Sequence, residues 1–334
     1  MSRPVSSATS GTPTTPATAT TPTAAHPPVT PTPAAAFATS AVSRSSDLRL
    51  AGAPISWGVC EVPGWGPMLP VDTVLGEMAD LGLTATELGP PGYLPDDPAV
   101  LKGVLAGHGL TLVGSFAALV LHERDRVAQS AAAAERTAAL IAAAGGEVLV
   151  LAAATGLDGY DTRPELCDAQ WRCLIEAADD IARIARGYGL RTTLHPHVGT
   201  HVETSAEVER FLGDSTLPLC LDTGHLLIGG TDPLDLVRRH PDRIGHVHLK
   251  DVHARLAALV RSGLLTYADA VGQGIYRPLG DGDVPVAEIV ATLRAAGYRD
   301  WYVLEQDTRL TDDPVDADLP RHNTARSLAH LRGN

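Results

Sequence analysis

The sequence predicts one α/β domain, a closed (β/α)8 barrel, preceded by a disordered segment. Short β-rich runs alternate with amphipathic helical stretches, and eight such units fit between residues 47 and 334. This alternation favours a parallel sheet, and eight units in roughly 250 residues are typical of a closed barrel. The alternative, an open doubly wound sheet, usually carries a Gly-rich phosphate turn after its first strand. The segment SWGVCEVPGWG (56–66) has glycines but lacks that motif.

The first 46 residues form a separate low-complexity segment. Pro, Thr, Ala and Ser dominate it, with no helical or strand period. Such a composition buries too little apolar surface to offset the entropy of ordering, so we predict disorder over 1–46. A tether or partner arm and a dispensable extension both agree with this composition. Without an apolar region between charged and small-residue flanks, the segment is a poor signal peptide.

Eight strands are predicted in the barrel domain. Each is a short run rich in apolar or β-branched residues. They lie at 53–58, 84–89, 110–116, 147–153, 191–197, 217–225, 243–251 and 301–307. Several intervening stretches have a glycine just before the next strand, which indicates helix C-termini. These glycines are Gly82, Gly109, Gly146, Gly189 and Gly297.

Charge and composition exclude several classes of partner. The chain has 26 basic and 39 acidic residues, a net charge of −13, and without Arg3 and Arg44 of the first segment the barrel domain carries −15. This charge repels phosphate backbones and anionic lipids, so we expect neither nucleic acid nor a membrane as partner. The four cysteines show no C-x-x-C spacing, which indicates reduced thiols in a cytoplasmic protein. They are Cys60, Cys167, Cys173 and Cys220.

Polar side chains gather at the C-terminal ends of the predicted strands, where barrels have their active sites. Taken singly, each has an ordinary interpretation, such as a helix N-cap or a hydrogen-bonded histidine. The fifth to eighth strands, however, each place an imidazole or a carboxylate at the same depth. Buried polar groups are costly unless they are paired or bind a metal. The four candidate ligands are His195, Asp222, His248 and Glu305.

Two histidines and two carboxylates suit one divalent ion with open positions for substrate oxygens. Other residues at this face point to a polyol or keto-sugar pocket. Trp57 could cover a sugar ring or pack in the core, and Glu87 could accept hydrogens from hydroxyl groups. The loop 277–284 could close over a substrate or form a turn and an N-cap. The connection 252–277 is long enough for a lid or for a contact in a homo-oligomer.

Seven segments together carry a resemblance to a known family. In this order and spacing, the barrel domain resembles the xylose isomerase-like superfamily of sugar isomerases and epimerases, and more narrowly the inosose dehydratases. The segments are PISWGVCEVPGWG (54–66), LGLTATELGPPGYLP (81–95), LHPHVGTHVET (194–204), LCLDTGHLLIGGTDP (219–233), HVHLKDV (246–252), RPLGDGDV (277–284) and LEQD (304–307).

The resemblance implies one divalent metal ion, with Mn²⁺ or Co²⁺ expected first and Mg²⁺, Fe²⁺ or Zn²⁺ also compatible. Asp222, His248 and Glu305 match the ligands that the superfamily carries on its sixth, seventh and eighth strands. His195 stands on the fifth strand where epimerases carry Glu. The dehydratase-like members share the H-x-H-x-G-T pattern found at 195–200, so this departure supports the narrower assignment.

The histidine at position 195 also bears on the reaction. An epimerase uses a base on each face of a carbon, and a ligated imidazole has no free lone pair to serve as one. A β-elimination needs one base, a Lewis acid and an acid for the departing hydroxyl. We therefore expect a carbon–oxygen lyase that dehydrates 2-keto-myo-inositol (scyllo-inosose) to a trihydroxycyclohexane-1,2-dione in inositol catabolism, as the resemblance implies. The alternative is an isomerase, epimerase or eliminating enzyme for another keto-sugar.

Roles for the remaining residues stay open between acid and base. Lys250 would need a lowered pKa to act as a base. The expected catalytic residues are Lys250, His225 and Glu305. The expected substrate contacts are Trp57, Glu87, His197, His225 and Lys250. Two other functions remain as rivals: an abasic-site endonuclease, which would need a basic face, and a carbohydrate-binding barrel, which would carry no metal.

Overall fold

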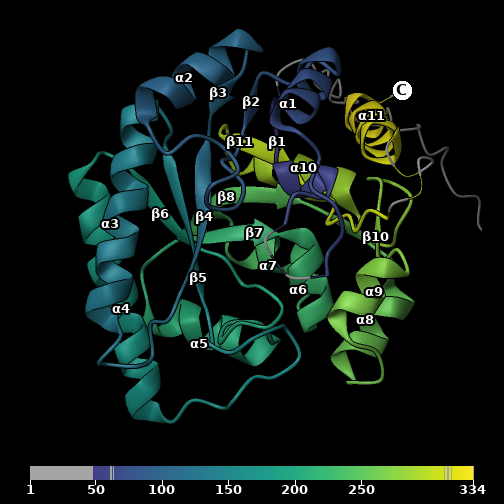
Figure 1. Ribbon diagram of the computed structural model, residues 1–334. Helices are drawn as coiled ribbons and strands as arrows, with labels where there is room; N and C mark the ends of the chain where they lie inside the picture. The colour runs from purple at the N-terminus through teal and green to yellow at the C-terminus, as the bar shows by residue number, and fades with distance from the viewer. Residues whose placement is uncertain are drawn as a thin grey trace, which may run out of the picture. The chain divides into compact units, whose positions relative to one another are not determined.

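The computed structural model describes residues 48–60, 62, 64–311, 313, 316 and 318–333, so the predicted disordered segment 1–46 lies outside the described residues. Strands and helices alternate around one parallel sheet (Figure 1). Its order is β3-β2-β1-β11-β8-β7-β6-β5-β4. The two end strands, β3 (Thr111–Leu112) and β4 (Gly114–Leu119), are separated by Val113 alone and are halves of one strand. The sheet therefore closes as the predicted eight-stranded barrel.

The other strands of the barrel are short. They are β1 (Arg49–Gly52), β2 (Ala85–Thr86), β5 (Val148–Ala153), β6 (Arg191–Leu194), β7 (Leu219–Asp222), β8 (Ile244–Leu249) and β11 (Trp301–Leu304). Most end earlier than the sequence predicts, because the chain leaves the sheet where the polar residues begin. β6, for example, ends one residue before His195.

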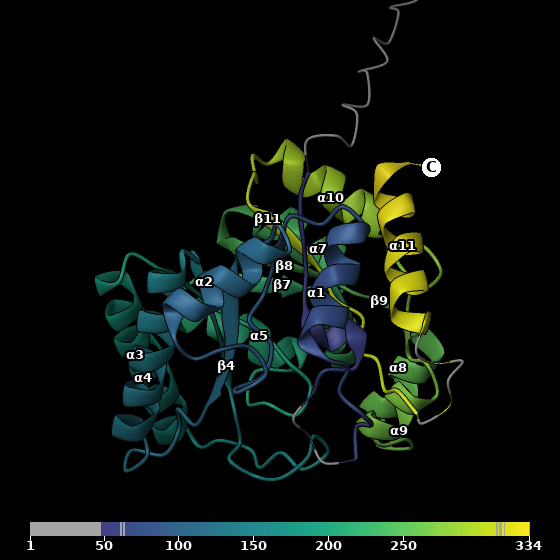
Figure 2. The same cartoon turned by 45° about the horizontal axis from the view of Figure 1, so that its top comes forward.

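Helices surround the strands on the outside of the barrel (Figures 1 and 2). They are α1 (Val71–Asp80), α2 (Pro98–Gly107), α3 (Val127–Ala144), α4 (Asp168–Gly187), α5 (Ser205–Asp214), α6 (Thr223–Gly229), α7 (Pro233–Arg239), α10 (Val286–Ala295) and α11 (Leu319–Arg332). Among the described residues, no helix is both long and apolar enough to cross a membrane.

The first predicted strand is misplaced. Strand β1 lies before the predicted range 53–58, and Pro54–Trp57 forms a 3-10 helix instead. Pro54 has no N–H for a sheet ladder, and Gly58 ends the turn with φ 75°, a left-handed conformation that favours glycine. A second correction concerns the end of α3, where Gly145 rather than Gly146 takes the left-handed conformation, with φ 91°.

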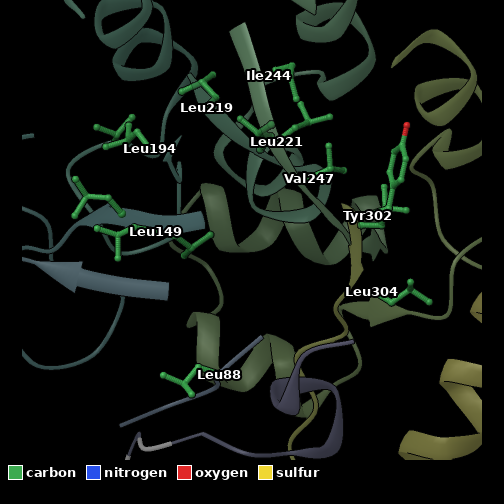
Figure 3. Close-up of a cluster of buried hydrophobic side chains, with 14 of the residues drawn as sticks. Leu88, Leu149, Leu194, Leu219, Leu221, Ile244, Val247, Tyr302 and Leu304 are labelled. Carbon is green, nitrogen blue, oxygen red and sulfur yellow. The ribbon is translucent and has the colours of Figure 1, made fainter. Parts of the chain in front are cut away.

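The two faces of the strands have different roles, because successive side chains of a strand point in opposite directions. Leu219 and Leu221 of β7 belong to the large apolar cluster between strands and helices (Figure 3). Cys220 and Asp222 alternate with them, and Cys220 packs against Val148 and Val150 of β5 in a separate cluster. The inner face of the barrel is thus free to carry polar groups at its C-terminal end.

The long connection after β8 folds into its own small unit. It contains β9 (Asp251–Val252), α8 (Ala254–Arg261), α9 (Tyr267–Gly272) and β10 (Tyr276–Arg277). The two strands pair antiparallel and tie the ends of the connection together.

The loop 277–284 follows this unit. In this loop, the backbone N–H groups of Gly280, Gly282 and Val284 donate hydrogen bonds to the buried carboxylate of Asp251. Of the two structures predicted for the loop, a lid or a turn, these bonds favour a fixed turn.

Candidate active site

Four neighbouring strands bring the four candidate ligands together. His195 follows β6, Asp222 ends β7, His248 lies in β8 and Glu305 follows β11. Asp222 and His248 are paired directly across β7 and β8, so their side chains leave the sheet on the same face. All four are nearly excluded from water, Glu305 having the most exposed side chain at 10%.

The distances among these side chains suit a metal ion. His248 Nδ1 lies 3.1 Å from Glu305 Oε2 and 3.7 Å from Asp222 Oδ2. His195 Nε2 lies 3.3 Å from the same Asp222 oxygen. Metal–ligand bonds of about 2.0–2.2 Å place neighbouring ligand atoms about 3.0–3.4 Å apart. Asp222 Oδ2 and His248 Nδ1 are buried and make no hydrogen bond to the described residues, so an ion would satisfy both.

Asp222 is held in place by its other oxygen. Oδ1 accepts hydrogen bonds from the backbone N–H groups of Gly224 and His225, at 2.9 and 2.8 Å, and so caps helix α6. This cap fixes the carboxylate and leaves Oδ2 facing His195 and His248. The same aspartate therefore serves as an N-cap and is oriented as a candidate ligand.

Lys250 lies in a ring of acceptors beside the candidate ligands. Its Nζ is 2.7 Å from Asp307 Oδ1, 3.0 Å from Glu305 Oε2 and 3.4 Å from Asp222 Oδ2. It is also 3.1 Å from His225 Nε2. Burial alone would lower the pKa of Lys250, but Asp222, Asp307 and Glu305 raise it well above its usual value. Lys250 is therefore held as an ammonium that can donate hydrogen bonds.

His197 and His225 form a closely packed pair of neutral imidazoles, with their ring planes tilted by 32°. Their ring centroids are 3.7 Å apart. His197 Nδ1 lies 2.7 Å from the carbonyl oxygen of Val198, so this nitrogen carries the hydrogen. Burial, with His195 and Lys250 nearby, lowers the pKa of His197 to about 3. Burial, His197 and Lys250 likewise lower the pKa of His225 well below its usual value.

Glu87 contacts two histidines of β8. Its Oε1 lies 2.8 Å from His246 Nε2 and 3.0 Å from His248 Nε2. Burial would raise the pKa of Glu87, but His248 and His246 lower it, so the group is a carboxylate. The oxygen expected to accept hydrogens from substrate hydroxyls already accepts them from these two imidazoles.

Trp57 does not lie among the candidate ligands and the histidines beside them. Its side chain is fully buried in the apolar core, and its indole N–H donates to Glu77 Oε2 of α1 at 2.7 Å. Other aromatic rings stand by the histidines instead. The rings of Phe116, Tyr160 and Tyr267 lie 5.5, 6.0 and 6.0 Å, between centroids, from a histidine of the cluster.

Two tyrosines that no sequence pattern indicates also belong to the site. The hydroxyl of Tyr267 in α9 donates to Asp307 Oδ2 at 2.7 Å and lies 2.8 Å from the hydroxyl of Tyr276 in β10. Both side chains are almost fully buried. They come from the long connection after β8, where no strand period marks which residues face the site.

An eight-stranded parallel barrel with imidazoles and carboxylates at the C-terminal ends of its strands defines an enzyme-like (β/α)8 barrel. The family described as "Xylose isomerase-like TIM barrel" has a model that matches residues 75–333. The chain belongs to this family.

Individual proteins are similar to this chain over most of its length. The inosose dehydratase of Geobacillus kaustophilus (strain HTA426) is 32% identical over 296 residues, 85% of this chain and 96% of that protein. The rhizopine catabolism protein MocC of Rhizobium meliloti is 34% identical over 291 residues, 84% of this chain and 89% of that protein. Together with further inosose dehydratases, these relatives confirm the predicted resemblance and the predicted enzyme class, a carbon–oxygen lyase.

Solved structures agree with the fold. The crystal structure of the IOLI protein with a bound zinc atom has a TM-score of 0.63 and 15% sequence identity, and the match covers 86% of this chain and 98% of that one. At this level of identity the similarity supports the barrel fold alone.

Proposed function

We propose that the protein is a divalent-metal-dependent hydro-lyase that converts 2-keto-myo-inositol to a trihydroxycyclohexane-1,2-dione. One observation carries the proposal: buried, unbonded Asp222 Oδ2 and His248 Nδ1 converge with His195 and Glu305, beside the ammonium of Lys250. The similarity to inosose dehydratases supports the choice of a keto-inositol as substrate.

The elimination breaks two bonds. A proton leaves the carbon next to the ketone, and a hydroxyl leaves the carbon beyond it, so the products are an enol of the dione and water. The reaction needs a base, a stabiliser of negative charge on the ketone oxygen and an acid. When bound, a divalent ion supplies the Lewis acidity that stabilises this charge. The residues that would hold it are His195, Asp222, His248 and Glu305.

We assign Lys250 as the acid that protonates the departing hydroxyl. Its Nζ contacts the carboxylates of Asp307 and Glu305, at 2.7 and 3.0 Å, and these contacts maintain the protonated ammonium. An ammonium can give its proton to a hydroxyl that leaves as water. The contact with Glu305 also holds the donor beside one of the residues that would bind the ion.

We assign His225 as the base that removes the carbon-bound proton. Its Nε2 is 3.1 Å from Lys250 Nζ, which places an acceptor and a donor side by side. The ring packs against that of His197, with 3.7 Å between the ring centroids. One base suffices for an elimination, whereas an epimerase needs a second base on the opposite face. With a histidine at position 195 in place of Glu, the site lacks a carboxylate in the position where epimerases have one of their two bases.

Incubation with scyllo-inosose tests this function. Metal-free protein loaded with Mn²⁺, Co²⁺ or Mg²⁺ should form a dione with strong ultraviolet absorption, and a chelator should stop the reaction. His248→Ala should abolish it, whereas Tyr188→Phe, an exposed change remote from the candidate ligands, should not. Absence of water loss with all three metals would contradict the proposal. Solvent deuterium in recovered substrate without any dione would favour the rival epimerase.

A further inference from the structure

A second group of buried polar side chains shares His248 with the candidate ligands and has no role in the proton transfers above. Glu87 follows β2, and His246 and His248 lie two residues apart in β8, on the same face of that strand. A single oxygen, Glu87 Oε1, lies 2.8 Å from His246 Nε2 and 3.0 Å from His248 Nε2. Glu87, His246 and His248 are 3%, 0% and 1% exposed.

A charged group here is costly for the fold. Neighbouring parts of the barrel interior are apolar, lined by Ala51, Ala85, Val113 and Val303. Well-packed apolar residues often replace a buried ionic group without loss of stability. A contribution to the stability of the fold therefore does not explain the carboxylate of Glu87. Its effect on His246 and His248 explains it better.

Its effect on His248 follows from the chemistry of the imidazole. A carboxylate accepts hydrogen bonds, so the ring nitrogen that faces it, Nε2, carries a hydrogen. The lone pair of the neutral ring is then on Nδ1. That nitrogen is the one that faces Glu305 Oε2 at 3.1 Å and Asp222 Oδ2 at 3.7 Å. One contact thus selects the tautomer of His248 and fixes the orientation of its ring.

His246 also contacts Glu87 and so helps to fix the contact between Glu87 and His248. Its Nε2 lies on the same carboxylate oxygen as His248 Nε2, so the two imidazoles hold Oε1 between them. The other ring nitrogen, His246 Nδ1, makes no hydrogen bond to the described residues. Among those residues, the hydrogen bond of His246 is therefore the one to Glu87.

We propose that Glu87 and His246 are a positioning pair that presents His248 Nδ1 to the metal ion. The inference rests on the proposed function because it needs an ion beside Asp222, His248 and Glu305. It changes the expected role of Glu87 from a substrate contact to support of a metal ligand. Loss of such support typically lowers metal affinity by about 10- to 100-fold.

Metal binding by the full-length protein tests the pair without any assay of activity. Mn²⁺ is titrated into metal-free wild type, Glu87→Gln, His246→Asn and the double variant, and free Mn²⁺ is followed by electron paramagnetic resonance. We expect one ion per wild-type chain and an affinity about 10- to 100-fold lower in Glu87→Gln. His246→Asn should lower it several-fold, and the double variant should be less impaired than the sum of both changes, because the residues act as one unit.

Two further measurements separate positioning from general destabilisation. The visible spectrum of bound Co²⁺ should differ between Glu87→Gln and wild type, since His248 would no longer be fixed. The matched control is Glu123→Gln, which removes a carboxylate 3.4 Å from the buried His122 and should leave the affinity and the spectrum unchanged. Thermal unfolding of the metal-free variants checks their fold. If Glu87→Gln does not fold, His246→Asn carries the test.

The outcomes are distinct. Equal Mn²⁺ affinity in wild type and in the folded variants would overturn the positioning pair and leave the proposed function intact. Two ions per wild-type chain, with one lost in Glu87→Gln, would also overturn it, because Glu87, His246 and His248 would then be ligands themselves. A wild-type chain that binds none of Mn²⁺, Co²⁺ or Mg²⁺ would contradict both proposals.

Discussion

At the scale of single residues, His225 and Lys250 divide the two proton transfers of the proposed reaction. They lie 3.1 Å apart but differ in charge, because burial keeps the imidazole neutral whereas three carboxylates keep the amine protonated. Pairs of titratable groups whose surroundings drive their pKa values apart are typical of acid and base in one site.

This division predicts different behaviour for two variants in deuterated water. Lys250→Met should lose the departing hydroxyl's proton donor, so dione formation should fall by about 100-fold or more. Exchange of the substrate's carbon-bound hydrogen should persist in Lys250→Met because His225 remains. His225→Gln should lose both the exchange and the dione. Mass spectrometry of recovered substrate measures the exchange, and the opposite pattern in the two variants would reverse the assignment.

A second residue-scale prediction concerns His195. Its Nε2 lies 3.3 Å from Asp222 Oδ2, so His195→Ala should remove a ligand of the proposed ion. The loss of affinity for Mn²⁺ should exceed the about 10- to 100-fold that changes in outer residues cause. His201→Ala, a change to another buried histidine of the same loop, should bind Mn²⁺ as the wild type does. Calorimetric titration of both variants compares the two histidines, and equal affinities would remove His195 from the ligand set.

At the scale of elements, the connection after β8 completes the site with groups that no strand provides. Tyr267 in α9 donates to Asp307, and Asp307 in turn contacts Lys250 at 2.7 Å. The backbone N–H of Tyr267 also donates to Asp161 Oδ1, at 2.9 Å, in the loop after β5. Helix α9 is thereby fixed from two directions, and Asp307 links its tyrosine to the ammonium of Lys250.

Removal of the Tyr267 hydroxyl should therefore impair catalysis. Tyr267→Phe leaves Asp307 short of one donor, and a hydrogen bond to a charged group contributes about 1.5–3 kcal/mol, so we expect kcat to fall by about tenfold or more. The control is Tyr188→Phe, which removes an exposed hydroxyl bound to Glu135 at 3.2 Å. Steady-state kinetics on scyllo-inosose compares them, and equal kcat values would exclude a role for the hydroxyl.

The same elements show what the sequence could predict. His195, Asp222, His248 and Glu305 were predicted together because strand parity and the common depth of parallel strands place such residues at one end of a barrel. For Trp57 the sequence leaves two positions open, over a sugar ring or in the core. Pro54 and Gly58 turn the chain into a 3-10 helix, and the indole packs in the core.

Contacts between segments that are distant in the chain could not be predicted from the sequence. The Glu87–His246 contact spans 159 residues, and the Tyr267–Asp307 contact joins a helix of a long loop to a strand end. Periodicity within one segment carries no information on either, because it reports which face a residue occupies but not which residue of another segment it meets.

At the scale of the whole molecule, buried neutral histidines make stability depend on pH. His122 and His201 are packed with ring centroids 4.2 Å apart. Burial lowers the pKa of both, that of His201 to about 4 with His122 and Arg163 as further causes. The unfolded chain binds a proton near pH 6.5, where the folded chain does not, so stability is complete above this pH and falls as the pH drops towards 4.

The variant His201→Asn isolates this effect, because an amide does not titrate. Relative to wild type, its free energy of unfolding should increase between pH 6.5 and 4, by up to about 3 kcal/mol for a shift of this size. Urea unfolding of both proteins across this range measures the difference. A difference that does not change with pH would mean that His201 is protonated equally in the folded and unfolded chains.

The most direct test of the central claim locates the metal. Crystals of the Co²⁺-loaded protein, measured at the cobalt absorption edge, should show one anomalous peak bound by His195 Nε2, Asp222 Oδ2, His248 Nδ1 and a carboxylate oxygen of Glu305. Such a peak, with Lys250 and His225 beside it, is the result that the proposed dehydratase requires. A peak elsewhere, or between Glu87 and His246, or no peak at all, would contradict it.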